Sequence, residues 1–271
     1  MNEHPLFQVD AFTGEAFRGN PAAVVVLDEP ADDGWQQAVA AEMNLSETAF
    51  LRNVGPASYA LRWFTPTVEV ELCGHATLAA AHVLWTEGFV DDGAPIRFDT
   101  RSGPLVATRH TTGDDGDAVI ELDFPANTAV ERPAPDGFLA ALGLDAGRFA
   151  ATADGWYLVE LPDAGAVRRL TPDFAALAAF PTCVVTAPGD GGSGDAAVVS
   201  RVFGPSVGID EDPVTGSAHC VLATWWAGRL GDAFRAEQAS ARGGTLDVLL
   251  AGERVLLAGR AVTVLRGHLV A

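Results

Sequence analysis

A weak internal repeat is the feature of this sequence that most restricts its fold. Three short patterns occur twice in the same order: Arg-x-Phe-x-Pro-x-Val at 62–68 and 201–207, a glycine before an apolar run at 74 and 216, and Arg-x-Gly-x-Leu at 101–105 and 242–246. The two copies are 139, 142 and 141 residues apart. Matches at such a constant spacing predict two structurally related halves.

Each half has the same predicted order of elements: a strand, a Pro-containing turn, a glycine, an apolar helix and a second strand. Strands are expected where residues alternate or run apolar between Gly, Pro and Asp, at 67–72, 95–100, 119–124, 245–250 and 254–259. Helices are expected at 33–44, 76–87, 135–142, 171–180 and 217–230. The predicted fold class is therefore α+β.

The chain is long enough for two domains, since it has 271 residues of which 48% are hydrophobic. We expect a boundary between residues 113 and 114, with 125–135 as the alternative. The Gly-rich segment 189–195 is instead expected to connect two strands of a hairpin, 181–187 and 196–203.

The formal net charge of −19 argues against binding to nucleic acid or to an anionic membrane surface. The N-terminus lacks a basic region followed by an apolar core, and runs such as 175–188 contain proline and are too short to cross a bilayer. We therefore expect a cytoplasmic protein. The three cysteines, Cys73, Cys183 and Cys220, form no CxxC pattern, so neither a disulfide framework nor a zinc site is expected.

Lysine is absent from the sequence, so all 17 basic residues are arginine. A Schiff base to pyridoxal phosphate or to a carbonyl substrate needs a lysine amine, and a P-loop needs one as well. No GxGxxG motif follows a predicted strand, which disfavours a dinucleotide site. We therefore expect no cofactor, and chemistry that relies on acids, bases, thiols and backbone dipoles.

Glu47 is the first candidate for that chemistry. In a strand over 45–51, the period of two would place its carboxylate on one face with Leu45, Ala49 and Leu51. Burial on such a face disfavours the charged form of a carboxylate, which suits a group that takes and returns a proton. The alternative is a glutamate at a sheet edge that reaches solvent. Glu69 and Glu71, by contrast, are predicted to line a solvated face of their strand.

Gly74 and Gly216 each begin an apolar helix, so each half presents free backbone N–H groups at an equivalent place. Two such helix starts could hold an anionic substrate. His75 and Ser217 occupy the same first-turn position in the two repeats. Taken singly, Ser217 could be an N-cap and His75 a satisfied polar residue.

Two further residues lie beside these helix starts. Asp212 is the member of the carboxylate cluster 210–212 nearest to Gly216, and mutual repulsion favours proton uptake by one of the three, so it is the second acid/base candidate. A solvated turn is the alternative for this cluster. Cys73 precedes Gly74 at a helix N-terminus, an environment that lowers the pKa of a thiol. Cys183 and Cys220 are expected to be core residues.

Six motifs spread over nearly the whole chain resemble those of the PhzF family of phenazine-biosynthesis-like isomerases. They are FRGNP at 17–21, NLSET at 44–48, RWFTP at 62–66, CGHAT at 73–77, EDPVTGSA at 211–218 and QxSxRGG at 238–244. The resemblance implies a diaminopimelate epimerase-like fold of two pseudo-symmetric domains. Each is a mostly antiparallel, barrel-like sheet around a central helix, with the active site in the cleft between them.

The resemblance also implies that the final strand returns to the first domain. The first domain would then comprise 1–113 and 261–271, and the second 114–260. Members are commonly homodimers, so a homodimer is expected here, with a small carboxylated metabolite as the other partner.

The family's phenazine enzyme isomerises a dihydro-hydroxyanthranilate without a cofactor, and a glutamate shuttles the proton. By motif, that role falls on Glu47. The residues that contact the substrate would be His75, Asp212 and Ser217. The backbone amides of Gly74 and Gly216 would bind it as well. Asn20 would lie near the cleft. We expect His75 and Asp212 to assist proton transfer.

Two other functions stay open at this point. One is an epimerase or racemase acting at a single carbon, with Cys73 or Asp212 as its second base; related epimerases use two opposed cysteines, of which only Cys73 has a match here. The other is a small-molecule-binding relative without turnover.

Overall fold

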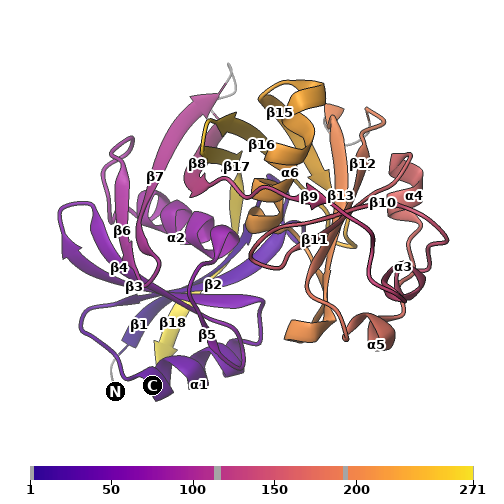
Figure 1. Ribbon diagram of the computed structural model, residues 1–271. Coiled ribbons are helices and arrows are strands. Elements are labelled where there is room, and N and C mark those ends of the chain that lie inside the picture. The colour runs from indigo at the N-terminus through magenta and orange to yellow at the C-terminus, as the bar shows by residue number, and fades with distance from the viewer. Residues whose placement is uncertain (1–2, 113–116, 192–194, 271) are drawn as a thin grey trace. The chain divides into compact units, whose positions relative to one another are not determined.

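The computed structural model describes residues 3–112, 117–191 and 195–270 (Figure 1). The chain divides into two compact units, here called the first unit (Met1–Phe124 with Leu257–Ala271) and the second unit (Pro125–Leu256). The boundary predicted between residues 113 and 114 lies outside the described residues. The chain re-enters the first unit at Leu257, and the last strand pairs with the first, as the family resemblance implies.

The first unit is a mostly antiparallel sheet that curves around one helix. Its strands follow the order β18 (Ala261–Val270), β1 (Glu3–Ala11), β2 (Asn20–Leu27), β3 (Glu47–Gly55), β4 (Ser58–Phe64), β6 (Ile96–Thr100), β7 (Gly103–Thr112) and β8 (Asp117–Pro125). Only the β2/β3 and β4/β6 pairs are parallel among these. Helix α2 (Gly74–Thr86) packs on β1, β2, β3 and β18 and buries ten of its residues. Helix α1 (Asp33–Met43) connects β2 to β3, and the short β5 (Glu69–Val70) pairs with β4.

The second unit repeats this arrangement with its own strands. Their order is β9 (Val130–Glu131), β10 (Arg148–Ala151), β11 (Tyr157–Glu160), β12 (Cys183–Pro188), β13 (Val198–Gly204), β15 (Ala233–Gln238) and β16 (Gly244–Ala251). The parallel pairs, β11/β12 and β13/β15, stand at the same two places in the order as in the first unit. Short β14 (Ile209–Asp212) pairs with β13, and α6 (Gly216–Leu230) is the counterpart of α2. β17 (Arg254–Gly259) carries the chain back to the first unit. The predicted fold class and repeat are thus confirmed.

The sequence pattern predicts the three long helices correctly but not the short ones. α1, α2 and α6 match their predicted ranges to within two residues at each end. The ranges 135–142 and 171–180 shorten to α3 (Phe138–Ala141) and α5 (Phe174–Leu177), because Gly137 adopts a left-handed conformation and Asp173 caps the helix that follows it. α4 (Ala164–Arg168) was not predicted. The hairpin predicted around 189–195 forms between β12 and β13, although residues 192–194 lie outside the described residues.

The repeat extends to matching ion pairs. In the first unit, Arg62 Nε and Nη2 donate to the two carboxylate oxygens of Glu69 at 2.7 and 2.8 Å. In the second unit, Arg201 makes the same bidentate contact with Glu211 at 2.7 and 2.8 Å. Each guanidinium also lies over a phenylalanine ring two residues along its strand, at 5.0 and 4.9 Å. Each pair fastens a short strand, β5 or β14, just before the central helix.

The ion pair of Glu69 corrects the prediction that this residue lies on a solvated face. Its side chain is only 15% exposed, whereas Val68 and Leu72 are the exposed residues of this segment. The predicted strand 67–72 is reduced to Glu69–Val70, so its alternation does not separate a core face from a solvent face. Glu71 is exposed, as predicted.

Replacing Glu211 by Gln should lower the free energy of unfolding by about 2 kcal/mol, because it leaves a mostly buried guanidinium without its charged partner. The Arg201 side chain is 12% exposed, and within the described part of the chain Glu211 is its sole carboxylate partner. Urea unfolding measures the change, and Asp99→Asn is the control because Asp99 and Arg97 form an exposed pair. Equal effects of the two substitutions would contradict the prediction.

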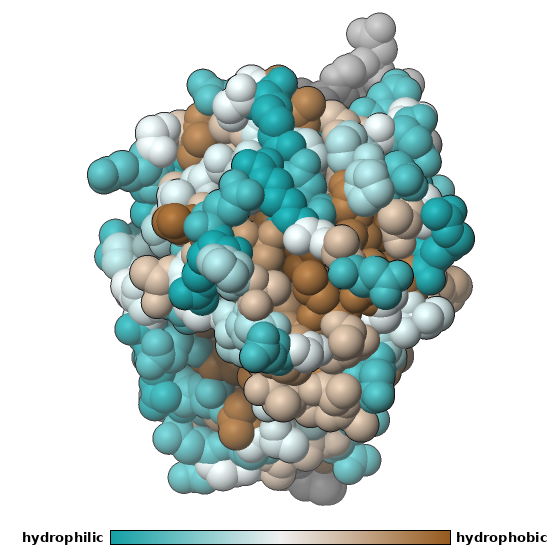
Figure 2. All heavy atoms as spheres, turned by 45° about the vertical axis from the view of Figure 1, so that its right-hand side comes forward, coloured by the Kyte–Doolittle hydropathy of each residue, from teal (hydrophilic) through white to brown (hydrophobic). Residues whose placement is uncertain are grey.

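Polar side chains cover much of the face shown in Figure 2. On the face shown in Figure 2, hydrophilic residues surround a group of hydrophobic ones. Among the described residues, none of the helices has both the length and the hydrophobicity needed to span a bilayer.

Candidate active site in the first unit

Glu47 is the first residue of β3, where it pairs with Ala22 of the parallel strand β2. Its side chain is 12% exposed. The following residues, from Thr48 to Leu51, are all buried, so β3 is covered on both faces and the alternation used for the prediction does not distinguish them. Leu45 lies before the strand. Glu47 is thus a largely buried carboxylate at the start of its strand.

The Glu47 carboxylate lies next to the ring of His75. His75 is the second residue of α2, and its Nε2 atom lies 3.0 Å from Glu47 Oε2, an ion-pair distance. The contact lacks the alignment of a hydrogen bond, and Glu47 Oε2 is buried without a hydrogen-bond partner among the described residues. A buried carboxylate oxygen left in this state is uncommon in folded proteins and indicates a functional group.

The opposite edge of the His75 ring is held by two other residues. His75 Nδ1 lies 3.2 Å from Asn20 Nδ2 and 3.5 Å from Cys73 Sγ. Because the Asn20 amide donates to Nδ1 in the neutral ring, the ring proton then resides on Nε2, facing Glu47. Nε2 carries a proton in the charged ring as well. Asn20, at the start of β2, is fully buried, so β2, β3 and α2 together position this group.

The charge state of His75 reflects its neighbours. Burial lowers the pKa of His75, but nearby Cys73 and Glu47 outweigh this effect and raise the pKa well above its usual value. In its charged form the ring would stabilise a carboxylate at Glu47.

The prediction that the helix start lowers the pKa of the Cys73 thiol is wrong. Cys73 is the N-cap residue of α2, but it lies buried, and burial together with Glu47 raises the pKa of its thiol rather than lowering it. Burial likewise raises the pKa of Cys183 and of Cys220 to about 12, in agreement with their expected place in the core.

All three thiols should therefore resist iodoacetamide in the folded protein near pH 7.5, because alkylation requires an accessible thiolate. Mass spectrometry should find three labelled cysteines after denaturation and almost none before it.

We also expect Cys73→Ala to reduce turnover by much less than the 10²–10⁴-fold typical of losing a general acid or base. Rapid alkylation of Cys73 that parallels loss of activity would show that the thiol is a base.

The same three side chains raise the question of a metal site. Within the described part of the chain, Glu47, Cys73 and His75 offer ligand atoms that lie within 4.8 Å of one another. Glu47 and Cys73 approach different nitrogens of His75, so an ion held by all three residues would use one of these two nitrogens. Of the described residues, these three are the ones placed to hold a metal ion.

The remaining predicted residues belong to the second unit. Asp212 ends β14, and its carboxylate accepts a hydrogen bond from Thr215 Oγ1. Gly216, the buried first residue of α6, is followed by Ser217, which is exposed. The N-cap of α6 is Thr215, so Ser217 is not a capping residue.

Gln238, at the end of β15, holds the turn that contains Asp212. Its Nε2 atom donates to the Asp212 carbonyl oxygen at 2.7 Å, and its Oε1 atom accepts from the Thr215 amide at 2.9 Å. Ser240 Oγ donates to the Pro213 carbonyl oxygen at 2.8 Å. Both residues belong to the QxSxRGG motif, which by itself indicates no role for either of them.

Both central helices begin without a side-chain cap. Their starts superimpose in sequence, with Cys73 matching Thr215 and Thr77 matching His219, each 142 residues apart. Thr77 Oγ1 donates to the Cys73 carbonyl oxygen at 2.6 Å, and His219 Nδ1 makes the corresponding contact with the Thr215 carbonyl oxygen at 2.8 Å. The repeat offset of 142 residues is the sequence signal that identifies His219 as the counterpart of Thr77. The first-turn amides are the backbone groups that an anion could contact at each start.

Comparison with known proteins agrees with this architecture. The family described as phenazine biosynthesis-like protein matches residues 9–267. An uncharacterized isomerase of Halalkalibacterium halodurans is 45% identical over all of both chains, and one of Pseudomonas aeruginosa is 48% identical over 98% of this chain and 99% of its own. The crystal structure of a PhzF family protein from Enterococcus faecalis superimposes with a TM-score of 0.89 at 39% identity, over all of both chains.

The fold and the residue set therefore define a protein of the diaminopimelate epimerase-like class. Within that class, the chain belongs to the PhzF family of phenazine biosynthesis-like proteins.

Proposed function

We propose that this protein is a cofactor-independent isomerase that moves a proton between two carbons of a small carboxylated substrate, with Glu47 as the acid/base. One observation carries the proposal. Glu47 Oε2 is buried, has no hydrogen-bond partner among the described residues, and lies 3.0 Å from His75 Nε2. Such an oxygen can accept a proton from substrate carbon, while the charged neighbour stabilises the carboxylate before and after transfer.

In this mechanism, the Glu47 carboxylate removes a proton from one carbon, and the electron pair of the broken C–H bond enters the conjugated system of the substrate. The resulting carboxylic acid then returns the proton to a different carbon, which restores the carboxylate. Atoms and charge balance without an oxidant or reductant. His75 would stay in contact with Glu47 throughout and would assist the transfer by orienting the carboxyl group.

Substrate binding is assigned to the uncapped helix starts. We propose that the amides at Gly74 and Gly216 bind the substrate carboxylate, and that Asp212 and Ser217 contact the remainder of the substrate. The hydrogen bonds from Gln238 support this role for Asp212, since they fix the turn that leads into α6. Asn20 would act indirectly, by orienting the His75 ring.

The proposal is tested by incubating the wild-type protein in D₂O with a dihydro-hydroxyanthranilate and a panel of small unsaturated carboxylates, followed by NMR. An isomerase of the proposed kind should move a double bond and introduce deuterium at the newly protonated carbon. Inversion of a stereocentre with the double bonds in place would instead identify an epimerase. Binding without any exchange would identify a relative that lacks turnover.

A further inference from the structure

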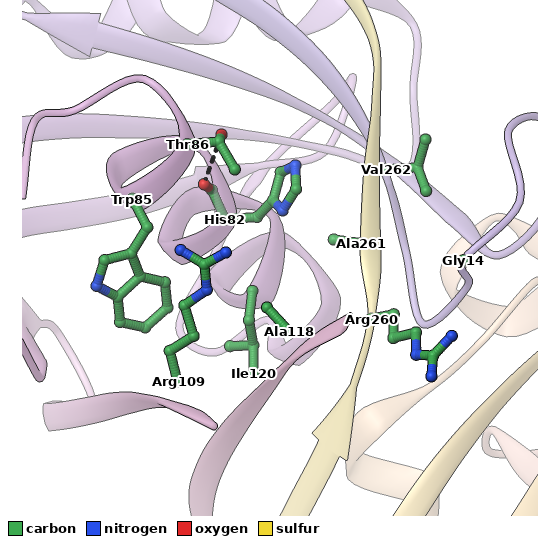
Figure 3. A pocket seen from close by; sticks show the side chains of 10 residues that line it. All are labelled: Gly14, His82, Trp85, Thr86, Arg109, Ala118, Ile120, Arg260, Ala261 and Val262. Atoms are coloured by element: carbon green, nitrogen blue, oxygen red, sulfur yellow. Dashed lines mark hydrogen bonds between the residues drawn. The ribbon is translucent and has the colours of Figure 1, made fainter. Parts of the chain in front are cut away.

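A pocket of about 260 Å³ lies in the first unit, and neither Glu47 nor His75 is among the residues that line it. Its lining comes from α2, β7, β8, the segment at Gly14, and the junction of β17 and β18 (Figure 3). His82 lies seven residues after His75, or about 10 Å further along the helix axis. A molecule in this pocket would therefore contact α2 at a different place from the proposed catalytic group.

The charged residues of the lining are all basic. Arg109 and Arg260 lie on opposite sides of the pocket, and no aspartate or glutamate is among the residues that line it (Figure 3). This is notable in a chain with 36 acidic and 17 basic residues. Arg109 does bind Asp92 at 2.6 Å, but the Asp92 side chain is 80% exposed, so solvent weakens this pair.

The surroundings of His82 in the pocket lower its pKa. Burial and the positive charges of Arg109 and Arg266 lower the pKa of His82 to about 4, despite the opposing effect of Glu87. The neutral ring makes a hydrogen bond of 3.0 Å between Nε2 and Thr263 Oγ1, and its Nδ1 atom has no hydrogen-bond partner among the described residues.

Apart from Thr86 and Gly14, the remaining lining residues are apolar. They are Trp85, Ile120 and Val262, together with two alanines. An occupant that matched both features would carry one negative charge near Arg109 and an apolar body against Trp85 and Ile120. The volume suits a molecule with a single ring rather than a nucleotide.

The repeat provides an internal comparison for this composition. The positions in the second unit that correspond to His82, Trp85 and Arg109 are Thr224, Ala227 and Leu250. The shared fold therefore forms without a histidine, an indole or a guanidinium at these places. Their presence in the first unit needs an explanation other than the fold.

From these observations we propose that the pocket is a second ligand site, distinct from the Glu47 group, that binds a small aromatic carboxylate. The carboxylate would pair with Arg109. The ring would lie against Trp85 and Ile120. This proposal does not depend on the isomerase mechanism.

Benzoate is the probe, and benzamide is its neutral analogue of the same shape. Isothermal titration should show binding of benzoate to the wild-type protein and binding of benzamide at least about tenfold weaker, because the amide lacks the charge that the guanidinium recognises. Arg109→Gln should weaken benzoate binding by about tenfold or more. Asp92→Asn should strengthen it, since this removes the competing partner of Arg109 from an exposed position. Arg97→Gln, at an exposed arginine outside the pocket, is the matched control and should have no effect.

Binding at the Glu47 group is distinguished by Glu47→Gln, which should leave the benzoate affinity unchanged. Loss of benzoate binding in Glu47→Gln but not in Arg109→Gln would overturn the proposal, as would equal affinities for benzoate and benzamide. Absence of benzoate binding up to the millimolar range would overturn it as well. Because Asp92→Asn predicts a gain of affinity, the result does not depend on Arg109→Gln folding normally.

Discussion

Replacing Glu47 by Gln is expected to lower the turnover number by about 10²–10⁴-fold, the usual loss when a general acid/base is removed. Glutamine keeps the shape of the side chain but cannot accept a proton from carbon. The His75 ring would still face a polar group, so the fold should be retained. Turnover of the substrate found in the D₂O screen measures the effect, with thermal unfolding as the check on folding.

Glu42→Gln is the matched control, because Glu42 is an exposed glutamate on α1. It should leave turnover at the wild-type level. A Glu47→Gln variant that folds normally and turns over within a few-fold of wild type would remove Glu47 from the reaction. The proton acceptor would then have to be sought among the other candidates, beginning with Asp212.

Replacing Gly19 by Ala is expected to destabilise the protein by about 3 kcal/mol or more, through backbone strain together with a steric clash. Gly19 has a φ of +65°, and a Cβ atom there would lie 2.1 Å from the Ala11 carbonyl oxygen and 2.7 Å from Thr13 Cγ2. The backbone must therefore shift next to Asn20, the buried residue that contacts His75. Both stability and turnover should fall.

Gly88→Ala separates the two causes of this effect. Gly88 has a φ of +75°, but a Cβ atom at that position would meet nothing within 4 Å. Its substitution should cost only the conformational penalty of about 1 kcal/mol. Urea unfolding of both variants tests the comparison. Similar losses at Gly19 and Gly88 would show that the close approach to Ala11 is unimportant.

Much of the fold follows from local patterns in the sequence. The repeated Arg-x-Phe-x-Pro-x-Val and glycine motifs lie at equivalent strands and helix starts, and the long apolar helices α2 and α6 begin within two residues of prediction. These features depend on residues close together in the chain. The short helices were harder to predict, because a capping aspartate or a left-handed glycine outweighs four or five residues of helical pattern.

The site depended on contacts that local patterns do not contain. The alternation of its neighbours predicts a solvated face for Glu69, yet its ion pair with Arg62 on the adjacent strand β4 draws it inward. Cys73 was assigned a lowered thiol pKa because of its helix start, yet burial dominates. The approach of Glu47 to His75 joins residues 28 positions apart on different elements. The sequence named both residues, but their contact arises from the packing of α2 on the sheet.

The central claim is that Glu47 carries the migrating proton, and deuterium exchange tests it most directly. Substrate is incubated in D₂O with wild-type protein or with Glu47→Gln, and NMR follows deuterium at the reacting carbons while titration measures binding. We predict exchange with the wild-type protein, and none with a variant that still binds the substrate. Exchange at the wild-type rate in Glu47→Gln would contradict the account.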